Sequence, residues 1–349
     1  MKQSSDHKPL RARTAAIGVD IGGTNIKLGL VAPDGRVLLR GSFQTRADEG
    51  RAGVLGRLVE NILAVSSAAR QKGWGVKGVG IGAPGPVDVR RGWVYFFPNL
   101  PGWKNTPLKA ILERRLRLPV AVDNDANVMA LAEFRFGAGR GADPMVALTL
   151  GTGIGGGLVI GGRLFHGPAY SAAELGHISI QEDGPLCGCG SRGCVETYVG
   201  NGYFVRELKK RLKAASAAGR GRTRRRFGDG GHGLLEGWVF REKRELTPKL
   251  AALAARKGDP VASKLWEETG ERLGTMLAGL VNALNPQKIV LGGGVAQSGS
   301  LLFGPVVRTI GKKAFPIAAR SVRVVPAAFG VDAGVVGAAA LLFEGRNKP

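Results

Sequence analysis

Twice along this chain, an apolar strand runs into a glycine-rich turn that contains threonine, and a second apolar strand follows. The first such unit lies in AAIGVDIGGTNIKLGLV, with strands expected at residues 16–19 and 26–31. The second is MVALTLGTGIGGGLVIGGRLF, residues 145–165. Turn residues between apolar runs predict β-hairpins. The two units differ in sequence, but their shared design, with helical segments between and after them, favours an α/β fold built as two related halves.

The composition is that of a folded chain. With 349 residues, of which 44% are hydrophobic, it is long enough for two domains and can bury a core. It contains no run of about 18 apolar residues, and MKQSSDHKPLRARTAAIGVD at its start has no apolar segment of the signal-peptide type. We therefore expect a cytoplasmic protein without a membrane segment, in a compartment that disfavours stable disulfides.

The chain is strongly basic, with a formal net charge of +23 and a pI near 10.6, which predicts attraction to polyanions. Part of the excess is local, because residues 206–226 carry ten Lys or Arg and one acidic residue. We interpret this stretch as a solvated helix face that runs into a flexible basic loop. A footprint for nucleic acid or polyphosphate is the alternative.

The glycine-rich turns are candidate phosphate-binding loops. In DIGGTN, residues 20–25, glycine N–H groups can approach a phosphate closely, threonine adds a donor, and the aspartate can hold Mg²⁺ through water. A tight hairpin turn is the alternative. GTGIGGG, residues 151–157, contains a G-x-G-x-x-G match, but a strand follows it where a dinucleotide-binding fold requires a helix. The chain has no Walker A motif, and GGGVA, residues 292–296, could cover an adenosine ring.

Polar residues stand in VDNDAN, residues 122–127, where a strand is expected to meet a helix. Asp123, Asn124 or Asp125 could be the helix N-cap, which is the common use of these residue types. A carboxylate here could also accept the proton of a substrate hydroxyl. Phosphoryl transfer needs little more than such a base, Mg²⁺ and loops that hold the phosphates in line.

All three cysteines lie in LCGCGSRGC, and a histidine precedes them. His177, Cys187, Cys189 and Cys194 give the pattern H-x9-C-x-C-x4-C, the ligand count of a closed tetrahedral zinc site. A disulfide would leave one thiol unpaired, and the C-x-x-C redox spacing is absent. We therefore predict a structural zinc ion.

These motifs, in this order, resemble those of the ROK family of sugar kinases, a group that includes bacterial glucokinases, fructokinases, N-acetylhexosamine kinases and some repressors. The resemblance runs from about Ala16 to Leu342 and rests on DIGGTNIK, GIGAPGPVD, PNLPGW, NDAN, GTGIGGG, ELGH, CGCGSRGCVE, LGGGVA and DAGVVGAA. It implies an actin/hexokinase-like (ribonuclease H-like) α/β fold with two lobes around a central cleft. The implied lobes are residues 1–122 with 334–349, and residues 123–333 with a zinc loop at 177–194 and a basic loop near 214–232.

The resemblance also implies roles for individual residues. Asp125 would be the general base, and His177 would bind zinc through one ring nitrogen and face the sugar with the other. The implied sugar-binding residues are Asn124, Asp125, Glu174, His177 and Glu196, with Gly85 and Asn99 in motifs that line the sugar pocket. The implied nucleotide-binding residues are Asp20 near Mg²⁺, then Gly22, Gly23, Thr24, Asn25, Lys27, Gly151, Thr152 and Gly153 at the phosphates, and Gly293 and Gly294 beside the adenosine.

The implied activity is phosphoryl transfer from ATP to the 6-hydroxyl of a hexose, with glucose as the first choice. Fructose, mannose, N-acetylglucosamine and N-acetylmannosamine are alternatives, because Ala173 stands where the family usually has glycine, beside the sugar-binding residues. Polyphosphate is an alternative donor, although GGGV favours ATP. A sugar-responsive repressor is the alternative from another class of function, although the roughly 15 residues before the first strand are too few for the winged helix-turn-helix domain of such repressors. A homodimer or homotetramer is expected, and a nucleic-acid partner is not.

Overall fold

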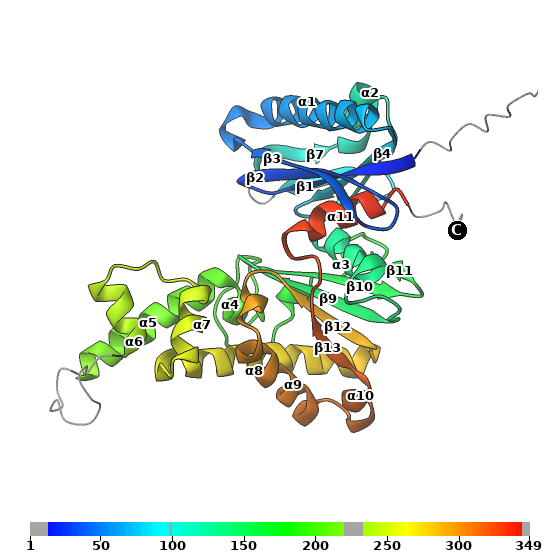
Figure 1. Cartoon of the computed structure of the whole chain (residues 1–349). Helices are drawn as coiled ribbons and strands as arrows, with labels where there is room; N and C mark the ends of the chain where they lie inside the picture. The colour runs from blue at the N-terminus through cyan, green and yellow to red at the C-terminus, as the bar shows by residue number, and fades with distance from the viewer. Residues whose placement is uncertain (1–12, 98–99, 220–232, 344–349) are drawn as a thin grey trace, which may run out of the picture. The chain divides into compact units, whose positions relative to one another are not determined.

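The computed structural model describes residues 13–97, 100–219 and 233–343 (Figure 1). They belong to two compact units. The first unit runs to residue 128 and resumes at residue 332, and the second comprises residues 129–331. The lobe limits implied by the sequence stay predictions, because compactness alone does not define a lobe that moves.

The first unit is built on a five-stranded sheet with the order β3-β2-β1-β4-β8. These strands are β1 (Arg13–Ile21), β2 (Asn25–Val31), β3 (Val37–Gln44), β4 (Trp74–Ala83) and β8 (Val120–Asn124). β1 and β2 form the predicted antiparallel hairpin across the DIGGTN turn, whereas β4 and β8 run parallel to β1. A smaller sheet contains β5 (Val87–Asp88), β6 (Trp93–Phe97) and β7 (Leu100–Thr106).

Helices lie on both faces of the larger sheet (Figure 1). α1 (Gly50–Gln71) and α2 (Leu108–Leu116) lie on one face, and α11 (Ala333–Ala340) lies on the other. The short helices η1 (Ala47–Glu49) and η5 (Gly330–Asp332) directly precede α1 and α11 in the chain. α11 contacts β1 and β4 so closely that a Cβ on Gly18 or Gly80 would collide with the backbone carbonyls of this helix. The small residues of GVDAGVVGAA therefore serve close helix–sheet packing.

Among the described residues, the segment Ala47–Gln71, which contains α1, is long and apolar enough to cross a membrane, with a mean hydropathy of 1.2. The core helices of globular proteins meet the same test of length and composition. Val54, Leu58 and Ile62 of this helix are fully buried in the core of the first unit. This side of α1 therefore packs as a core helix does.

The second unit repeats the strand order of the first, as β11-β10-β9-β12-β13. These strands are β9 (Met145–Leu150), β10 (Ile154–Ile160), β11 (Arg163–Leu164), β12 (Lys288–Gly292) and β13 (Arg323–Pro326). β9 and β10 form the second predicted hairpin, and β12 runs parallel to β9. The prediction of two related α/β halves is confirmed by this repeated topology.

α3 (Asp125–Phe136) leads from the first unit into the second. The other helices of the second unit are η2 (Leu175–His177), α4 (Glu196–Val199), α5 (Asn201–Gly219), α6 (Leu234–Glu236), the π-helix η3 (Gly237–Arg241), α7 (Pro248–Arg256), α8 (Pro260–Leu284), η4 (Val295–Ser298), α9 (Ser300–Lys313) and α10 (Pro316–Ser321). Asp259 caps α8 by accepting a 2.9 Å hydrogen bond from the Ala262 N–H. Gly270 and Gly274 of α8 let α9 approach closely, so this helix pair forms a tight layer of the core.

Candidate active site

The parallel strands of the first unit bring three predicted motifs to one edge of the sheet. β1, β4 and β8 run in the same direction, so their carboxyl ends lie together. Asp20 lies near the end of β1, Gly85 follows β4, and Asn124 ends β8. Residues that are far apart in the sequence thus share the edge at which ligands bind in open parallel sheets.

Asn124 and Asp125 stand where β8 meets α3. Asn124 Nδ2 donates a 3.0 Å hydrogen bond to the Gly85 carbonyl oxygen, and Asn124 Oδ1 accepts from the Ala126 and Asn127 N–H groups at 2.9 and 3.2 Å. The side chain therefore caps α3 and ties it to the loop after β4. That loop turns at Gly85, whose φ of +85° favours glycine. Asp125 is half-buried at the first position of α3, where the helix dipole favours a carboxylate.

The DIGGTN turn is a tight connection with an exposed tip. The Gly22 N–H donates a 3.1 Å hydrogen bond to the Asn25 carbonyl oxygen, and a Cβ on Gly22 would crowd that oxygen. Residues 23–25 are exposed, so their N–H groups can meet a ligand. Burial raises the pKa of the Asp20 carboxyl, and the charge of Lys27, opposite Asp20 in the hairpin, opposes this rise. A cation beside Asp20 would favour its ionised form, which fits the predicted place near Mg²⁺.

In the second unit, the carboxyl ends of β9 and β12 bring the other two glycine turns together. Residues 151–153 follow β9, and Gly293 and Gly294 follow the parallel strand β12. A Cβ on Gly293 would lie 2.7 Å from the backbone carbon and nitrogen of Leu150, and its φ is +87°. The phosphate-binding turn and the adenosine-binding turn predicted from the sequence are therefore neighbours.

The carboxylate of Glu196, at the start of α4, is held by the same glycine turn. Glu196 Oε2 accepts a 2.8 Å hydrogen bond from the Ile154 N–H, and Cys187 Sγ lies 3.7 Å from Glu196 Oε1. Gly153 leaves space for this arrangement, because a Cβ there would lie 3.0 Å from Glu196 Cδ and closer still to Oε2. The turn predicted to bind phosphates thus also positions a residue predicted to bind sugar.

Glu174 and His177 share one short turn around η2. The His177 N–H donates a 3.0 Å hydrogen bond to the Glu174 carbonyl oxygen. Ala173, immediately before them, has a φ of +68°, in the left-handed region that favours glycine. An L-residue in this region carries about 1–2 kcal/mol of strain. The departure from the family motif at Ala173 is therefore a local strain directly beside Glu174.

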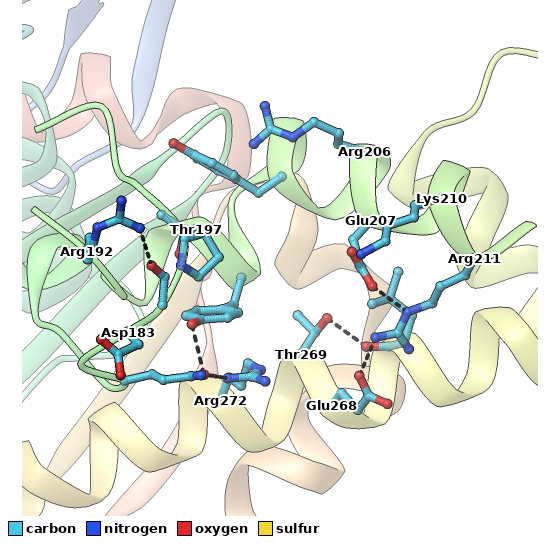
Figure 2. A pocket seen from close by; sticks show the side chains of 16 residues that line it. Asp183, Arg192, Thr197, Arg206, Glu207, Lys210, Arg211, Glu268, Thr269 and Arg272 are labelled. Atoms are coloured by element: carbon cyan, nitrogen blue, oxygen red, sulfur yellow. Dashed lines mark hydrogen bonds and ion pairs between the residues drawn. The ribbon is translucent and has the colours of Figure 1, made fainter. Parts of the chain in front are cut away.

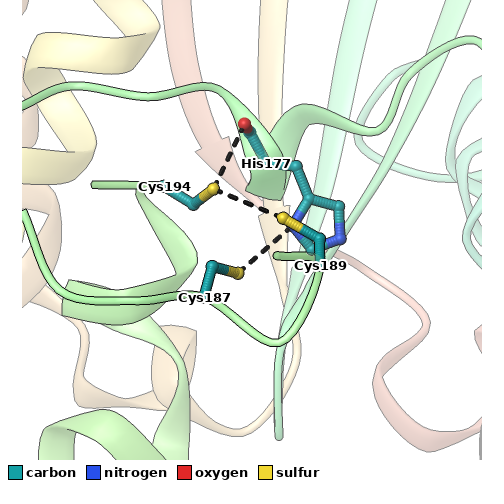
Figure 3. A group of neighbouring side chains, drawn as sticks. All are labelled: His177, Cys187, Cys189 and Cys194. Atoms are coloured by element: carbon teal, nitrogen blue, oxygen red, sulfur yellow. Dashed lines mark hydrogen bonds between the residues drawn. The ribbon is translucent and has the colours of Figure 1, made fainter. Parts of the chain in front are cut away.

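The histidine and the three cysteines converge (Figure 3). Cys187 Sγ lies 3.6 Å from His177 Nδ1, Cys189 Sγ lies 3.7 Å from Cys194 Sγ, and all four ligand atoms lie within 4.8 Å of one another. Zn²⁺ bonds of about 2.0–2.3 Å in a tetrahedron place ligand atoms roughly 3.5–3.8 Å apart. A disulfide needs about 2.05 Å between sulfurs, so the three thiols are free. The four residues therefore fit a tetrahedral metal ion.

Burial acts against the ionisation of two of the three thiols. Burial raises the pKa of Cys187 to about 12 and also raises that of Cys194, whereas a hydrogen bond from the Ser191 backbone lowers the pKa of Cys189. Thiolates are the form that binds metals, so a divalent cation here would replace the thiol protons. The loop is shaped by glycine, since a Cβ on Gly193 would collide with the Gln181 carbonyl oxygen.

Two of the sequence predictions fall outside the described residues. One is Asn99 in the sugar-pocket motif, and the other is the part of the basic stretch from residue 220 onward. The described part of that stretch lies in α5, where Lys209 and Lys213 are exposed as a solvated face requires.

The sequence reasoning missed a cavity in the second unit. Arg206 and Lys210 of α5 line this cavity together with Arg192 and Arg272, which come from other segments (Figure 2). The i, i+4 spacing of Arg206 and Lys210 places them on one helix face. This spacing is the one sign of the cavity in the sequence, but the sequence does not show which other segments this face of α5 contacts.

Comparisons with known proteins agree with one family over most of the chain. The model of the ROK family matches residues 16–344. A glucokinase from Thermotoga maritima is 38% identical over 328 residues, which cover 94% of this chain and 97% of the relative. A xylose repressor from Caldicellulosiruptor bescii is 30% identical over 300 residues, covering 86% of this chain and 70% of the repressor.

A solved structure is similar over nearly the whole chain. It is a ROK family glucokinase from Streptomyces griseus in complex with glucose and AMPPNP, 39% identical, with a TM-score of 0.75. The alignment covers 95% of this chain and 100% of that one. The similarity therefore includes both units described above.

Proposed function

The chain belongs to the ROK family, and we propose that it is an ATP-dependent hexose kinase of the glucokinase type, which converts glucose and ATP into glucose 6-phosphate and ADP. The predicted actin/hexokinase-like α/β fold is confirmed by the same similarity. The observation that carries the proposal is the position of Asp125 at the start of α3, at the carboxyl edge of the first sheet.

In this proposal Asp125 accepts the proton of the sugar 6-hydroxyl as its oxygen attacks the γ-phosphorus of ATP. The new oxygen–phosphorus bond forms as the bond between the γ-phosphorus and the bridging oxygen of the β-phosphate breaks, and ADP leaves. Backbone N–H groups of the glycine turns at residues 22–25 and 151–153 would stabilise the phosphate charge. Mg²⁺ bound with ATP near Asp20 would neutralise part of that charge.

The sugar would be read by residues whose positions are fixed by their neighbours. Asn124 is held to Gly85 and to the start of α3, so its exposed atoms can meet a hydroxyl in one orientation. Glu196 is held by the Ile154 N–H. Glu174 and His177 lie on one turn, and the Nδ1 atom of His177 faces the cysteines, which leaves Nε2 for the sugar.

We further propose that the metal held by His177, Cys187, Cys189 and Cys194 is zinc and that it is structural. Four protein ligands close a tetrahedral shell, so no position is left for a substrate or a catalytic water. Its contribution would be to fix the loop that carries His177 and ends at Glu196. A Cys₃His set of free thiols also fits the reducing cytoplasm that the sequence predicts.

A different hexose is the main alternative substrate, and polyphosphate is the alternative donor. Ala173 is strained beside Glu174, so the sugar preference of this chain is the most open part of the proposal. A sugar-responsive repressor is less well supported, because the xylose repressor is less similar to this chain than the glucokinases are. The homodimer or homotetramer stays a prediction.

The test is a coupled assay with glucose, fructose, mannose and the two N-acetylhexosamines, each with ATP or polyphosphate as the donor. We expect the highest kcat/KM with glucose and ATP. Asp125→Asn should lower kcat by about 10²–10⁴-fold with little change in glucose KM. Asp48→Asn, at an exposed acidic residue of the same unit, is the control and should leave kcat unchanged. Full activity of Asp125→Asn would exclude it as the base, and turnover of no hexose would exclude the kinase.

A further inference from the structure

The cavity that the sequence reasoning missed has a volume of about 670 Å³ and lies wholly within the second unit (Figure 2). Three segments form its walls: residues 181–192 of the loop that carries the candidate metal ligands (the metal loop, residues 177–194), α4 with the start of α5, and the middle of α8. Gln181 and Arg192 belong to the first wall, Arg206 and Lys210 to the second, and Arg272 to the third. None of these residues belongs to the proposed sugar or nucleotide site.

The lining has a net positive charge, because five Lys or Arg side chains outnumber the carboxylates of Asp183, Glu207 and Glu268. Arg211 is matched by two carboxylates, since its Nε lies 2.8 Å from Glu207 Oε1 and its Nη2 lies 2.6 Å from Glu268 Oε2. Lys210, one turn away, makes no ion pair within the part of the chain that the structure describes. Arg206 lies over the ring of Tyr203, 4.4 Å from its centroid, and likewise has no carboxylate partner among the described residues.

The hydrogen bonds of the other two cations go to neutral groups, although the charge of Arg272 also acts on Glu268. Arg272 lies 4.1 Å from the centroid of the Tyr198 ring and donates a 3.1 Å hydrogen bond to Gln181 Oε1. Arg192 donates to the Gly184 carbonyl oxygen at 3.4 Å. Guanidinium groups held by neutral partners keep their full charge and keep N–H donors for an anion, and arginine binds phosphate oxygens in a planar, bidentate manner.

From these contacts we propose that this cavity binds a small metabolite that carries a phosphate monoester. Arg206 and Lys210 would bind the phosphate, and the tyrosine rings of Tyr198 and Tyr203 would contact the organic part. The concave shape and the limited volume suit a sugar phosphate or a nucleoside monophosphate, whereas a nucleic-acid strand requires an open groove along the surface.

The cavity shares a wall with the proposed sugar site. Thr197 and Tyr198 line the cavity and directly follow Glu196 in α4. Thr197 Oγ1 donates a 2.8 Å hydrogen bond to the carbonyl oxygen of Cys194, and Tyr198 Oη lies 3.1 Å from Gln181 Oε1. A phosphate ester bound in the cavity would shift Thr197 and Tyr198, and with them the neighbouring Glu196. Binding in the cavity would therefore change the glucose KM. This regulatory part rests on the proposed function, whereas the binding itself does not.

The experiment measures binding by calorimetry to the metal-loaded protein, saturated with glucose and AMPPNP so that sugar and nucleotide sites are filled. The probes are glucose 6-phosphate, AMP and inorganic phosphate, with a single-stranded DNA oligonucleotide as a fourth arm. The variant is Arg206→Ala with Lys210→Ala. Its control is Lys209→Ala with Lys213→Ala, which removes the same charge from the exposed face of α5.

We expect saturable binding of a phosphate ester to wild type and control, and at least about tenfold weaker binding to the variant. The preferred probe distinguishes a sugar phosphate from a nucleotide. Equal binding by wild type, control and variant, or binding of none of the three phosphates, would overturn the proposal. Variant-sensitive binding of the oligonucleotide alone would replace it with a nucleic-acid surface. A glucose KM that the bound probe leaves unchanged would overturn the coupling through α4.

Discussion

Replacing Gly153 with alanine separates a functional role of the glycine turn from a structural one. Neither Gly153 nor Gly202, in the first turn of α5, has a positive φ, so both backbones accept alanine. The new Cβ at position 153 would lie 3.0 Å from Glu196 Cδ and closer to Oε2, which must move away from the Ile154 N–H. The atoms that give way are the far end of a flexible side chain, but the N–H of buried Ile154 loses its charged acceptor, so the free energy of unfolding should fall by about 1–3 kcal/mol.

Sugar binding should weaken as well. A hydrogen bond from a charged group contributes about 1.5–3 kcal/mol, and 1.4 kcal/mol is a factor of ten, so displacing the Glu196 carboxylate should raise the glucose KM by about 10- to 100-fold. Steady-state kinetics at saturating ATP measure this change, and thermal unfolding monitors stability. Gly202→Ala is the matched control, because its Cβ would meet no atom within 4 Å and it lies outside the turns proposed to bind phosphate, and it should leave the glucose KM within about twofold. A glucose KM unchanged in folded Gly153→Ala would refute the assignment of Glu196.

Three further predictions follow from other contacts. Cys194→Ser, or chelation of the wild type, should remove one metal ion per chain, counted by mass spectrometry, and should raise the glucose KM. Gly80→Ala should lower the free energy of unfolding in urea by about 1–3 kcal/mol or more, because its Cβ collides with α11, whereas Gly75→Ala in the same strand should change it by less than about 0.5 kcal/mol. The hydrogen bond from Arg211 lowers the pKa of Glu268 below its ordinary value of 4.5, so its stabilisation is present above that pH and is lost as the pH falls through the lowered pKa. The stability difference between wild type and Glu268→Gln should therefore narrow as urea titrations move from pH 6 toward pH 3.5.

The fold could be predicted from the sequence because the glycine turns at residues 20–25 and 151–153 each lie between two apolar strands. This pattern is compatible with few folds besides an α/β fold with two hairpins. Spacing alone predicts the hairpins at residues 20–25 and 151–153. It also predicts the set of four metal ligands, and the structure brings their ligand atoms together. The sequence VDNDAN by itself is compatible both with an N-cap and with a catalytic base. In the structure Asn124 Oδ1 accepts hydrogen bonds from two N–H groups of the first turn, and Asp125 Oδ1 also accepts one from the Ala126 N–H at 2.8 Å, so both side chains contact the start of α3 and the base role of Asp125 stays a proposal.

The cavity could not be predicted from the sequence because distant segments form it. Gln181, Arg206 and Arg272 come from segments up to 91 positions apart, and no local pattern tells that the face of α5 meets the outer side of the metal loop. The packing glycines were likewise unpredictable. Gly18 and Gly80 lie in strands that read as ordinary apolar runs, and only the approach of α11 from the far end of the chain makes them necessary.

The position of Glu196 links the parts of the second unit that the sequence presented as separate motifs. Its carboxylate accepts a hydrogen bond from the Ile154 N–H beside the turn proposed to bind phosphate and lies near Cys187, a proposed metal ligand, while the next two residues of α4 line the basic cavity. A shift of any one of these neighbours moves the same carboxylate. We therefore expect changes in the glucose KM from metal loss, from binding in the cavity and from nucleotide contact with the turn, because each acts through Glu196. The kcat should depend mainly on Asp125.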